Sequence, residues 1–521
     1  MVILAGGARC MKTLDLFFKL LLCLIFVFQG EVSAQDTPSK KDRQTALKAI
    51  RKEQWDTWYA TKRRKDSTLV TTQKEREAYL NSPLALEYRE SVRKQDSARH
   101  SNYLALLDSI YTDTRTLKLT NGGFASVPQK IFSLHHLDTL NLAFNEIENI
   151  RISSDNFNNL KYLNLSRNKL QTRNIRFDRN ESLTYLNLSE NECRKMPASL
   201  RRLKGLKVLK FSDNSPAEKP LKLKIYAWDS LKELDLSHNN LKKIPKRIRK
   251  LKNLEILNLS YNTIKTLKGI RHLNQVSELE ISFNPVFLNP KYLVEMPNLE
   301  RLIIRGCGIT HIPPEINRFN GLKKLVIPEN RLKSVPGEIG DLQTLENLML
   351  YKNQLTELPD ELYDLTNLVW LDVYYNELKY VSPNISRLKN LEILYLSYNK
   401  LRELPESLGE MTKLRELYLH HNQLRELPQS LSNLKQLKYL HVYENHLTTF
   451  PSQVLELKNL EELNLSFNLI ENFPMEIAAY EHLKYIYLDN NSTNKQSMSY
   501  EQFKWALKQL QDKGVMIKFD Y

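Results

Sequence analysis

The chain has 521 residues, more than one hydrophobic core usually organises, so it contains either several domains or one open-ended repeat array. Hydrophobic residues make up 41% of it and glycine is scarce at 14 residues, a profile typical of a regular Leu-based repeat. The net charge of +16 is compatible with nucleic acid, an anionic membrane surface or an acidic glycan as partner. We interpret charge runs such as residues 242–250 as a solvated outer face, and we expect no nucleic-acid partner.

Residues 1–34 have the three parts of a secretory signal peptide. An n-region that opens at Met11 is followed by an apolar h-region over residues 16–28. Residues 32–34, Val-Ser-Ala, match the small-x-small rule for cleavage before Gln35. We therefore predict that residues 1–34 are removed and that the mature chain is secreted or periplasmic.

A lipoprotein signal at Cys23 is the alternative to simple cleavage, although Leu22 stands where such a signal wants a small residue. The apolar run is interrupted by Lys19 and is short for a bilayer, and no later segment reaches the ~20 apolar residues that a spanning helix needs. The expected mature chain thus has no transmembrane anchor.

Residues 35–112 are charged, helical in composition and free of the repeat that follows. We expect a helical amino-terminal segment whose later part, residues 84–110, folds back as the first cap. The earlier part around Trp55, Trp58 and Tyr59 is a surface helix or partly disordered arm, or else an amphipathic helix that docks on the repeats or on a partner.

Residues 113–498 repeat the pattern Leu-x-x-Leu-x-Leu-x-x-Asn-x-Leu with a period near 23. The second leucine of each unit marks 17 copies, from Leu117 to Ile486. Two intervals depart from the period: the interval from Leu209 to Leu234 is two residues longer than the period, and the interval from Leu257 to Leu279 is one residue shorter. A fixed period of this length indicates a stacked-repeat architecture.

This pattern resembles the leucine-rich-repeat family over roughly three-quarters of the chain, and second halves such as Leu404-Pro405-x-x-Leu408 resemble its 23-residue class, of the secreted bacterial type. The resemblance implies an α/β fold, a curved right-handed solenoid with a parallel sheet on its concave face. To it we add the helical amino-terminal segment and a carboxyl-terminal helix-strand cap. The cysteine-rich flanking caps of the family's animal extracellular members are absent.

The repeat residues have a simple physical interpretation. In Leu-x-Leu, the two-residue period of a strand sends both leucines into the core. A buried Asn must satisfy its hydrogen bonds, so stacked residues such as Asn145 and Asn168 are expected to form a ladder to backbone groups. Cys193 and Cys307 occupy buried slots five repeats apart, about 24 Å at ~4.8 Å per strand. A disulfide requires Cα atoms within ~7 Å, so they cannot pair.

Residues expected on the concave face change character along the array. The positions between and just after the strand leucines are mostly Asn and Ser in the first half, whereas Tyr and His replace them in the second. Aromatic side chains on an open sheet are enriched at binding hot spots, although Tyr also favours strands in general. We therefore predict a partner-binding site made of Tyr351, Trp370, Tyr374, Tyr375, Tyr395, Tyr398, Tyr418, His420, Tyr439, His441 and Tyr443.

Residues 499–521 are expected to cover the other end of the array, because an exposed solenoid end is an open apolar edge. A capping box of Ser499 and Gln502 should open a helix that stops at Gly514. Alternating apolar residues over 515–519 then predict a last strand.

No catalytic, nucleotide-binding or metal-binding signature is present, so we predict neither an enzyme nor a cofactor. The pairs His135-His136 and His420-His421 are poor metal sites, since neighbours in an extended chain point to opposite sides. The expected function is a non-enzymatic, extracytoplasmic scaffold that binds a protein through its concave face. A carbohydrate-binding or cell-surface adhesin, and a structural envelope protein, are the alternatives.

Overall fold

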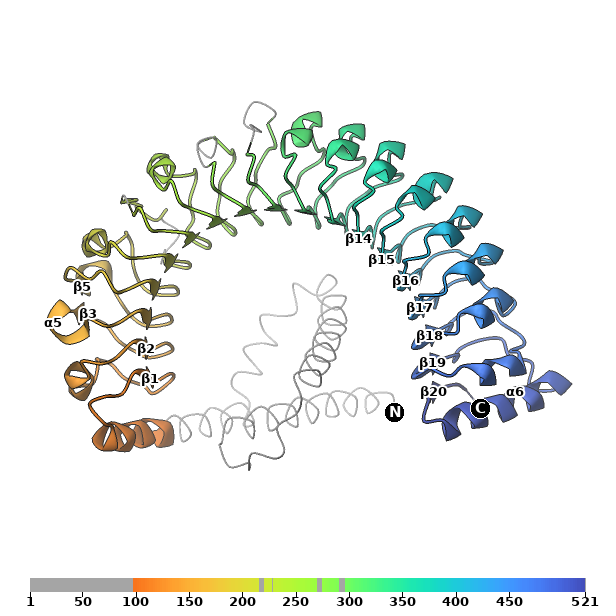
Figure 1. Cartoon of the computed structure of the whole chain (residues 1–521), viewed down its shortest axis with the longest axis horizontal. Coiled ribbons are helices and arrows are strands. Elements are labelled where there is room, and N and C mark those ends of the chain that lie inside the picture. The colour runs from red at the N-terminus through yellow and green to blue at the C-terminus, as the bar shows by residue number, and fades with distance from the viewer. Residues whose placement is uncertain (1–96, 215–219, 227, 269–273, 290–295, 521) are drawn as a thin grey trace, which may run out of the picture. The chain divides into compact units, whose positions relative to one another are not determined.

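The computed structural model describes residues 97–214, 220–226, 228–268, 274–289 and 296–520. The chain divides into two compact units, residues 1–93 and residues 94–521. The predicted signal peptide and most of the charged amino-terminal segment lie outside the described residues. In the second unit the repeats form a curved array, with strands on its inner side and short helices on its outer side (Figure 1).

Among the described residues, 18 strands of three residues form one parallel sheet. They pair in chain order, and each leucine at a strand centre lies opposite the next, as Leu394 does opposite Leu417. The strands are β1 (Thr116–Lys118), β2 (Thr139–Asn141), β4 (Tyr162–Asn164), β6 (Tyr185–Asn187), β7 (Val208–Lys210), β8 (Glu233–Asp235), β9 (Ile256–Asn258), β10 (Glu278–Glu280), β11 (Arg301–Ile303), β12 (Lys324–Val326), β13 (Asn347–Met349), β14 (Trp370–Asp372), β15 (Ile393–Tyr395), β16 (Glu416–Tyr418), β17 (Tyr439–His441), β18 (Glu462–Asn464), β19 (Tyr485–Tyr487) and β20 (Met516–Lys518).

The two irregular intervals do not disturb this sheet. β7 pairs with β8 through Val208 and Glu233, and β9 pairs with β10 through Ile256 and Glu278, with the leucines opposite each other in both cases. The extra or missing residues are therefore absorbed in the connecting segments. The parallel sheet and its repeat spacing confirm the α/β solenoid predicted from the sequence.

The outer side is formed by short 3₁₀ helices, most of which begin after a proline. Pro405, with φ of −71°, precedes η10 (Glu406–Glu410), and its carbonyl accepts a 3.1 Å hydrogen bond from the N–H of the buried Leu408. Proline suits this position because its fixed φ matches the entry to the turn. The other outer 3₁₀ helices are η1 (Gln129–Ser133), η2 (Thr172–Asn174), η3 (Ala198–Arg202), η4 (Lys246–Lys250), η6 (Pro314–Arg318), η7 (Gly337–Asp341), η8 (Asp360–Asp364), η9 (Pro383–Arg387), η11 (Gln429–Asn433), η12 (Ser452–Glu456) and η13 (Met475–Ala479).

The outer side also contains a second, small sheet that the sequence did not predict. β3 (Ile150–Ile152) and β5 (Ile175–Phe177) pair as a second, two-stranded parallel sheet, next to the short helix α5 (Ser154–Phe157). Their Ile-x-Ile and Ile-x-Phe sequences bury alternate residues, as a strand does, in place of the proline turn of other repeats.

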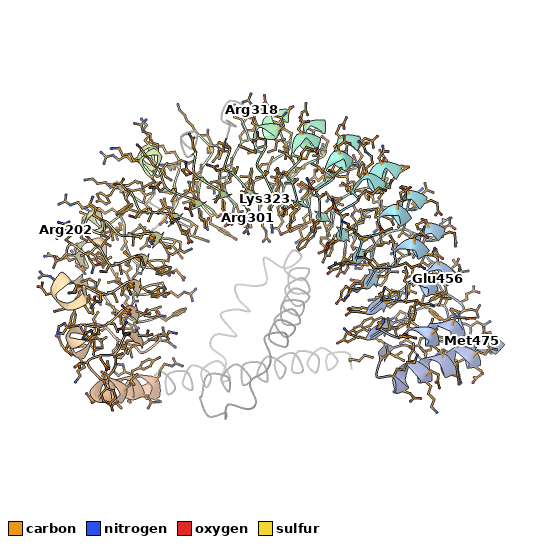
Figure 2. All side chains as sticks on the ribbon, viewed as in Figure 1. Arg202, Arg301, Arg318, Lys323, Glu456 and Met475 are labelled. Carbon is orange, nitrogen blue, oxygen red and sulfur yellow. The ribbon has the colours of Figure 1, made fainter. Side chains whose placement is uncertain are left out.

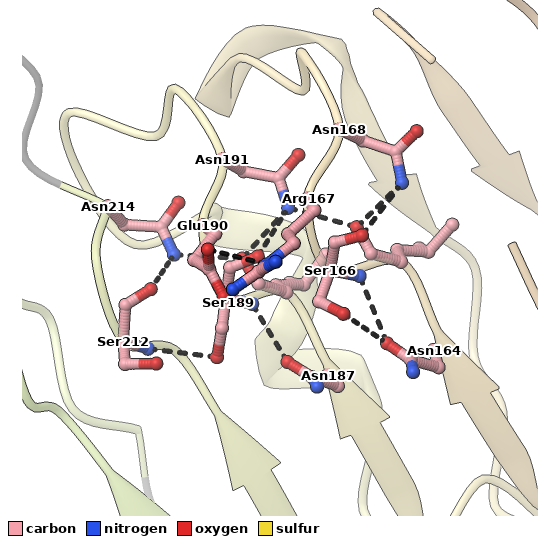
Figure 3. Close-up of polar contacts among 12 residues, drawn as sticks. Asn164, Ser166, Arg167, Asn168, Asn187, Ser189, Glu190, Asn191, Ser212 and Asn214 are labelled. Carbon is pink, nitrogen blue, oxygen red and sulfur yellow. Dashed lines mark hydrogen bonds and ion pairs between the residues drawn. The ribbon is translucent and has the colours of Figure 1, made fainter. Parts of the chain in front are cut away.

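The Asn ladder is present as predicted, and Figure 3 shows part of it. Asn168 donates from Nδ2 to the carbonyls of Leu142 and Leu165, both at 3.0 Å, and its Oδ1 accepts from the N–H of Ile147 at 3.0 Å. Each Asn thus ties its own turn to the preceding repeat. Cys307 takes the same slot, with its Sγ 3.4 Å from the carbonyl of Ile281.

Cys193 and Cys307 are both free and buried, as expected. Burial raises the pKa of Cys193 to about 12 and that of Cys307 to about 11, so both thiols are protonated at neutral pH. They serve as small core residues.

Residues at the two ends of the array cover its core. Residues 97–109 are helical, and Leu107 is buried there while Leu104 is 45% exposed. At the other end α6 (Met498–Asp512) packs on the last repeat, and β20 extends the sheet beyond β19. The predicted capping box is wrong: the helix N-cap is Ser497, and its side chain makes no capping hydrogen bond.

Candidate functional site on the concave sheet

The inner surface of each repeat ends in a residue with left-handed backbone. Four positions after the central leucine, φ is +55° at Tyr375, +54° at Tyr398 and +54° at His421. This conformation costs an L-residue roughly 1–2 kcal/mol. It is held by hydrogen bonds to the next repeat, such as that from the N–H of Tyr375 to the carbonyl of Ser397 at 2.9 Å. The arrangement places these side chains beside the strand residues of the same face.

Aromatic rings from neighbouring strands pack directly on one another in the second half of the sheet. The rings of Tyr395 and Tyr418 stack with centroids 4.2 Å apart and planes within 4°. His420 and Tyr443 stack at 4.3 Å. Ring pairs of this geometry contribute about 0.5–1.5 kcal/mol beyond the area they bury.

These contacts join into a continuous cluster, which we call the aromatic patch. It includes nine of the eleven residues predicted from the sequence, and the structure adds His421, whose ring lies 3.7 Å from that of Tyr398. The patch consists of Trp370, Tyr374, Tyr375, Tyr395, Tyr398, Tyr418, His420, His421, His441 and Tyr443.

Two predicted residues have different surroundings. Tyr351 lies near Arg305 and Asp372 at the edge of the patch, and burial raises its pKa. Tyr439 lies among glutamates on β16 and β18, and burial together with Glu461 raises its pKa to about 12. Neither joins the ring cluster through a described ring contact.

The patch is largely preorganised rather than fully exposed. Tyr375 is 52% exposed and is the most accessible of its rings, whereas His441 is only 8% exposed. Tyr418 is mostly buried, and its hydroxyl donates to Oε2 of Glu416 at 3.0 Å. The side chains are therefore fixed by one another, and preorganised side chains bind at a lower entropy cost than mobile ones.

Asp372, at the end of β14 and opposite Tyr395, lies inside this aromatic surface, although it is not among the site residues predicted from the sequence. Burial raises the pKa of Asp372 to about 7, and the N–H of Tyr374, which donates to its Oδ1 at 3.0 Å, opposes the shift only in part. Desolvation disfavours the charged form of a carboxyl group. Asp372 thus titrates near neutral pH beside the rings.

The histidines of the patch are also in unequal environments. Burial, reinforced by His441 and His421, holds the pKa of His420 well below its usual range, so its ring is neutral at pH 7. Its Nδ1 lies 3.0 Å from the hydroxyl of Ser397. His421 lies against Glu444, and His441 Nε2 is 3.0 Å from Oε1 of the buried Glu462.

A charged cluster borders the patch on its amino-terminal side. Arg305 forms a bidentate pair with Glu329, at 2.9 and 3.1 Å, and Lys352 lies 3.2 Å from the same carboxylate. Burial alone would raise the pKa of Glu329, but the hydrogen bonds and positive charges of Arg305 and Lys352 together outweigh burial, so its pKa is lowered. Bidentate geometry of this kind fixes both side chains.

The first half of the inner surface carries more aromatic side chains than we predicted from the sequence. His238, Tyr261 and Phe283 stack in successive left-handed positions, with centroids 4.1 and 4.3 Å apart. Tyr162 and Tyr185 also stack, at 4.3 Å. The first three rings occupy left-handed positions, and Tyr162 and Tyr185 open β4 and β6, so none of them belongs to the two strand columns used for the prediction.

Neither metal binding nor a membrane span is indicated in the part of the chain that the structure describes. No group of three or more His, Cys, Asp or Glu side chains there could hold a metal ion. None of the described helices is long and apolar enough to cross a membrane.

Comparisons with known families agree with this architecture. A family model described as a leucine-rich repeat region matches residues 311–427 and 376–512, and a leucine-rich-repeat model matches residues 113–170 and 229–286. Together they cover more than half of the chain. No curated protein matches it.

Several solved structures are similar. A leucine-rich-repeat protein of Leptospira interrogans is 27% identical, with a TM-score of 0.60, over 80% of this chain and 98% of its own. The ectodomain of a plant receptor kinase from Arabidopsis thaliana, in complex with Casparian strip integrity factor 2, is 26% identical, with a TM-score of 0.53, over 70% of this chain and 51% of its own. The Drosophila Toll–Spatzle complex is similar at 22% identity and a TM-score of 0.59, over 73% and 54%.

Proposed function

Because the chain belongs to the leucine-rich-repeat proteins, a fold commonly used for protein–protein binding in receptors, we propose that it is a non-enzymatic, extracytoplasmic scaffold whose aromatic patch binds a protein partner. The observation that carries this proposal is the continuous ring cluster on the open sheet. The core lies on the other side of the strands, so these rings are not needed to fill it.

The chemistry of the patch favours a protein partner. Tyr, Trp and His present apolar faces with polar tips, which suits a mixed apolar and hydrogen-bonding surface. The rim adds the charged cluster of Arg305, Glu329 and Lys352, and charged rims contribute specificity and association rate. The plant ectodomain above was solved in complex with Casparian strip integrity factor 2, and this use of the fold supports a protein partner.

Export belongs to the same proposal. The signal-like residues 1–34 support export, and the similarity to a Leptospira protein over 98% of that protein's length supports a bacterial type of leucine-rich-repeat protein. A secreted or periplasmic scaffold would meet its partner outside the cytoplasm.

A photo-crosslinking experiment tests the site directly. A benzoylphenylalanine side chain in place of Tyr375, which is 52% exposed, should form a discrete protein adduct in an envelope extract. The matched control is the same replacement of Tyr380, which is 51% exposed and lies before η9, outside the patch. Adducts from both positions alike, or none from position 375, would contradict the proposal.

Affinity measurements with the identified partner then test the energetics. Tyr374→Ala should weaken binding about thirtyfold, or about 2 kcal/mol, because truncating a hot-spot aromatic typically costs that much. Tyr380→Ala should change it less than twofold. If a glycan array, rather than a protein extract, yields the Tyr374-dependent ligand, the carbohydrate-binding adhesin is correct instead.

A further inference from the structure

The charge of the chain is concentrated on one stretch of repeats that the aromatic patch does not include. Residues 194–268 contain 20 Lys and Arg against 6 Asp and Glu, a formal net charge of +14, whereas the whole chain carries +16. A window of equal length, residues 387–461, contains 10 Lys and Arg against 9 Asp and Glu. We call the described residues of this stretch, 194–214, 220–226 and 228–268, the basic sector. Its excess charge is therefore a local property, not a property of the repeat.

Most of the described basic side chains in this stretch are exposed, and many lie on the outer helices and the segments beside them. η4 has the sequence Lys-Arg-Ile-Arg-Lys, in which Ile248 is the buried residue and the four basic side chains are exposed. η3 ends with Arg201 and Arg202, and Figure 2 shows Arg202 on the outer side of the array. Lys195 and Lys222 are joined by a parallel backbone bridge, so lysine follows lysine from one repeat to the next.

Ion pairs neutralise the second half of the array but not the basic sector. In residues 387–461, Lys389 lies 3.1 Å from Glu410 and Lys400 lies 2.9 Å from Glu377 of the preceding repeat. Among the described residues of the basic sector, three basic side chains have an acidic partner. These pairs are Arg202 with Asp178, Lys210 with Glu233 and Lys232 with Glu255. Because unneutralised like charge opposes the compact state, its retention on one sector points to an anionic partner.

The rest of the sector's surface narrows the class of partner. Among its described residues, only Tyr261 is an exposed large hydrophobic side chain, and its ring stacks in the concave row with His238 and Phe283. The outer helices thus have no aromatic platform for unpaired bases and no apolar anchor for a bilayer. A DNA duplex is itself convex and would touch an outward-curved surface along a narrow line. A thin, flexible polyanion can follow the basic side chains from repeat to repeat.

We propose that the basic sector binds a linear acidic polysaccharide, whose carboxylate or sulfate groups contact lysine and arginine side chains of successive repeats. The contacts are charge-assisted and exposed, so binding weakens steeply with salt. This site is separate from the aromatic patch, and it leaves the concave face open to a protein.

Binding to defined polymers tests the proposal with the full chain. The variant Lys246→Ser/Arg247→Ser/Arg249→Ser/Lys250→Ser removes four exposed charges and keeps Ile248 in the core. Its affinity for polygalacturonate or heparin at 150 mM NaCl should fall at least tenfold. The control variant Arg402→Ser/Lys413→Ser/Arg425→Ser/Lys458→Ser loses the same charge from exposed positions of the second half and should lose less than twofold.

Three results would overturn the proposal. One is an equal loss in both variants, which would indicate only net charge, and another is the absence of binding by the wild-type chain to either polymer. The third is tighter binding to a DNA duplex or to phosphatidylglycerol vesicles than to both polysaccharides. The first variant is replaced if its melting temperature is below that of the wild type. The replacement, Arg194→Ser/Lys195→Ser/Lys222→Ser/Lys242→Ser, removes four charges from other segments of the sector, and its affinity for the polymers should fall by the same factor. Polysaccharide binding by the basic sector does not depend on Tyr374. A failure of the proposed protein-binding site would therefore leave the polysaccharide result unchanged, and the two proposals are tested independently.

Discussion

Single polar side chains connect the repeats of this protein. Asn399 donates from Nδ2 to the carbonyls of Val373 and Leu396, at 3.1 and 2.9 Å, and accepts from the N–H of Leu378 at 3.0 Å. One buried amide therefore satisfies backbone groups of two repeats. A hydrophobic residue of similar size in this slot would leave those groups without partners, and each buried group costs about 1–3 kcal/mol.

We predict that Asn399→Leu lowers the free energy of unfolding by about 1–3 kcal/mol. Urea denaturation of the two chains measures the difference. Asn433→Leu, at an exposed position on η11, is the control and should stay within about 0.5 kcal/mol. Equal stabilities of the Asn399 variant and the wild type would show that the amide is not a required partner.

Asp372 makes the stability of the folded chain depend on pH, and its raised pKa fixes the direction of that dependence. Its pKa of about 7 in the folded chain lies above the usual value of 3.8, so the folded state binds the proton more tightly. Stability is then lost as the pH rises from about 4 to about 7, and it levels off above that window.

We predict that Asp372→Asn removes this loss. Asn occupies the same column elsewhere and makes the same bond, as Asn464 does by accepting from the N–H of Ser466 at 3.1 Å. The stability advantage of the variant should therefore widen by about 2 kcal/mol between pH 5 and pH 8. Denaturation curves at the two pH values check it, and a constant difference would contradict it.

At the scale of elements, the carboxyl-terminal helix shows how tertiary contacts override a local pattern. The Ser-x-x-Gln sequence predicted a capping box with Ser499 as the N-cap, yet the N-cap lies two residues earlier, at Ser497. The hydroxyls of both serines lie within hydrogen-bond distance of Oδ1 of Asn472, at 3.3 and 2.9 Å. These contacts to the last repeat replace the capping bonds that the sequence pattern predicts.

The same helix covers the end of the core through Phe503. Its ring lies 4.9 Å from Phe473 and 5.1 Å from Phe519, and it is 1% exposed. We predict that Phe503→Ala destabilises the chain by about 3–5 kcal/mol, the usual range for a buried Phe. Trp505→Ala, on the same helix but 52% exposed, should cost less than about 1 kcal/mol. Thermal melts of both variants decide whether the helix acts as a cap, and similar losses would show that it does not.

For the whole molecule, the period of the leucines predicts a stacked-repeat array, and the resemblance to the leucine-rich-repeat family implies the solenoid and the parallel sheet on its concave face. The left-handed positions could not be predicted in the same way, because Tyr398 and His421 adopt an unfavourable backbone only when the next repeat accepts their N–H groups. For the same reason the ring contacts between repeats, and the raised pKa of Asp372, needed the structure.

Processing of the whole chain is a separate prediction. If residues 1–34 are a signal peptide, the protein recovered from its host should begin at Gln35. Amino-terminal sequencing, or the intact mass, measures this. A mature chain that begins at a lipid-modified Cys23 would show a lipoprotein instead.

The unbroken strand register also bears on how such a chain is inherited. Since β7–β8 and β9–β10 stay in register across intervals of unequal length, each repeat presents the same backbone edge to whatever repeat follows it. A gene duplication or deletion of one whole repeat would leave every remaining neighbour correctly paired, because repeats of this kind contact only the adjacent ones. The number of repeats is thus a trait that can change in whole steps, and each step lengthens or shortens the surface available to ligands.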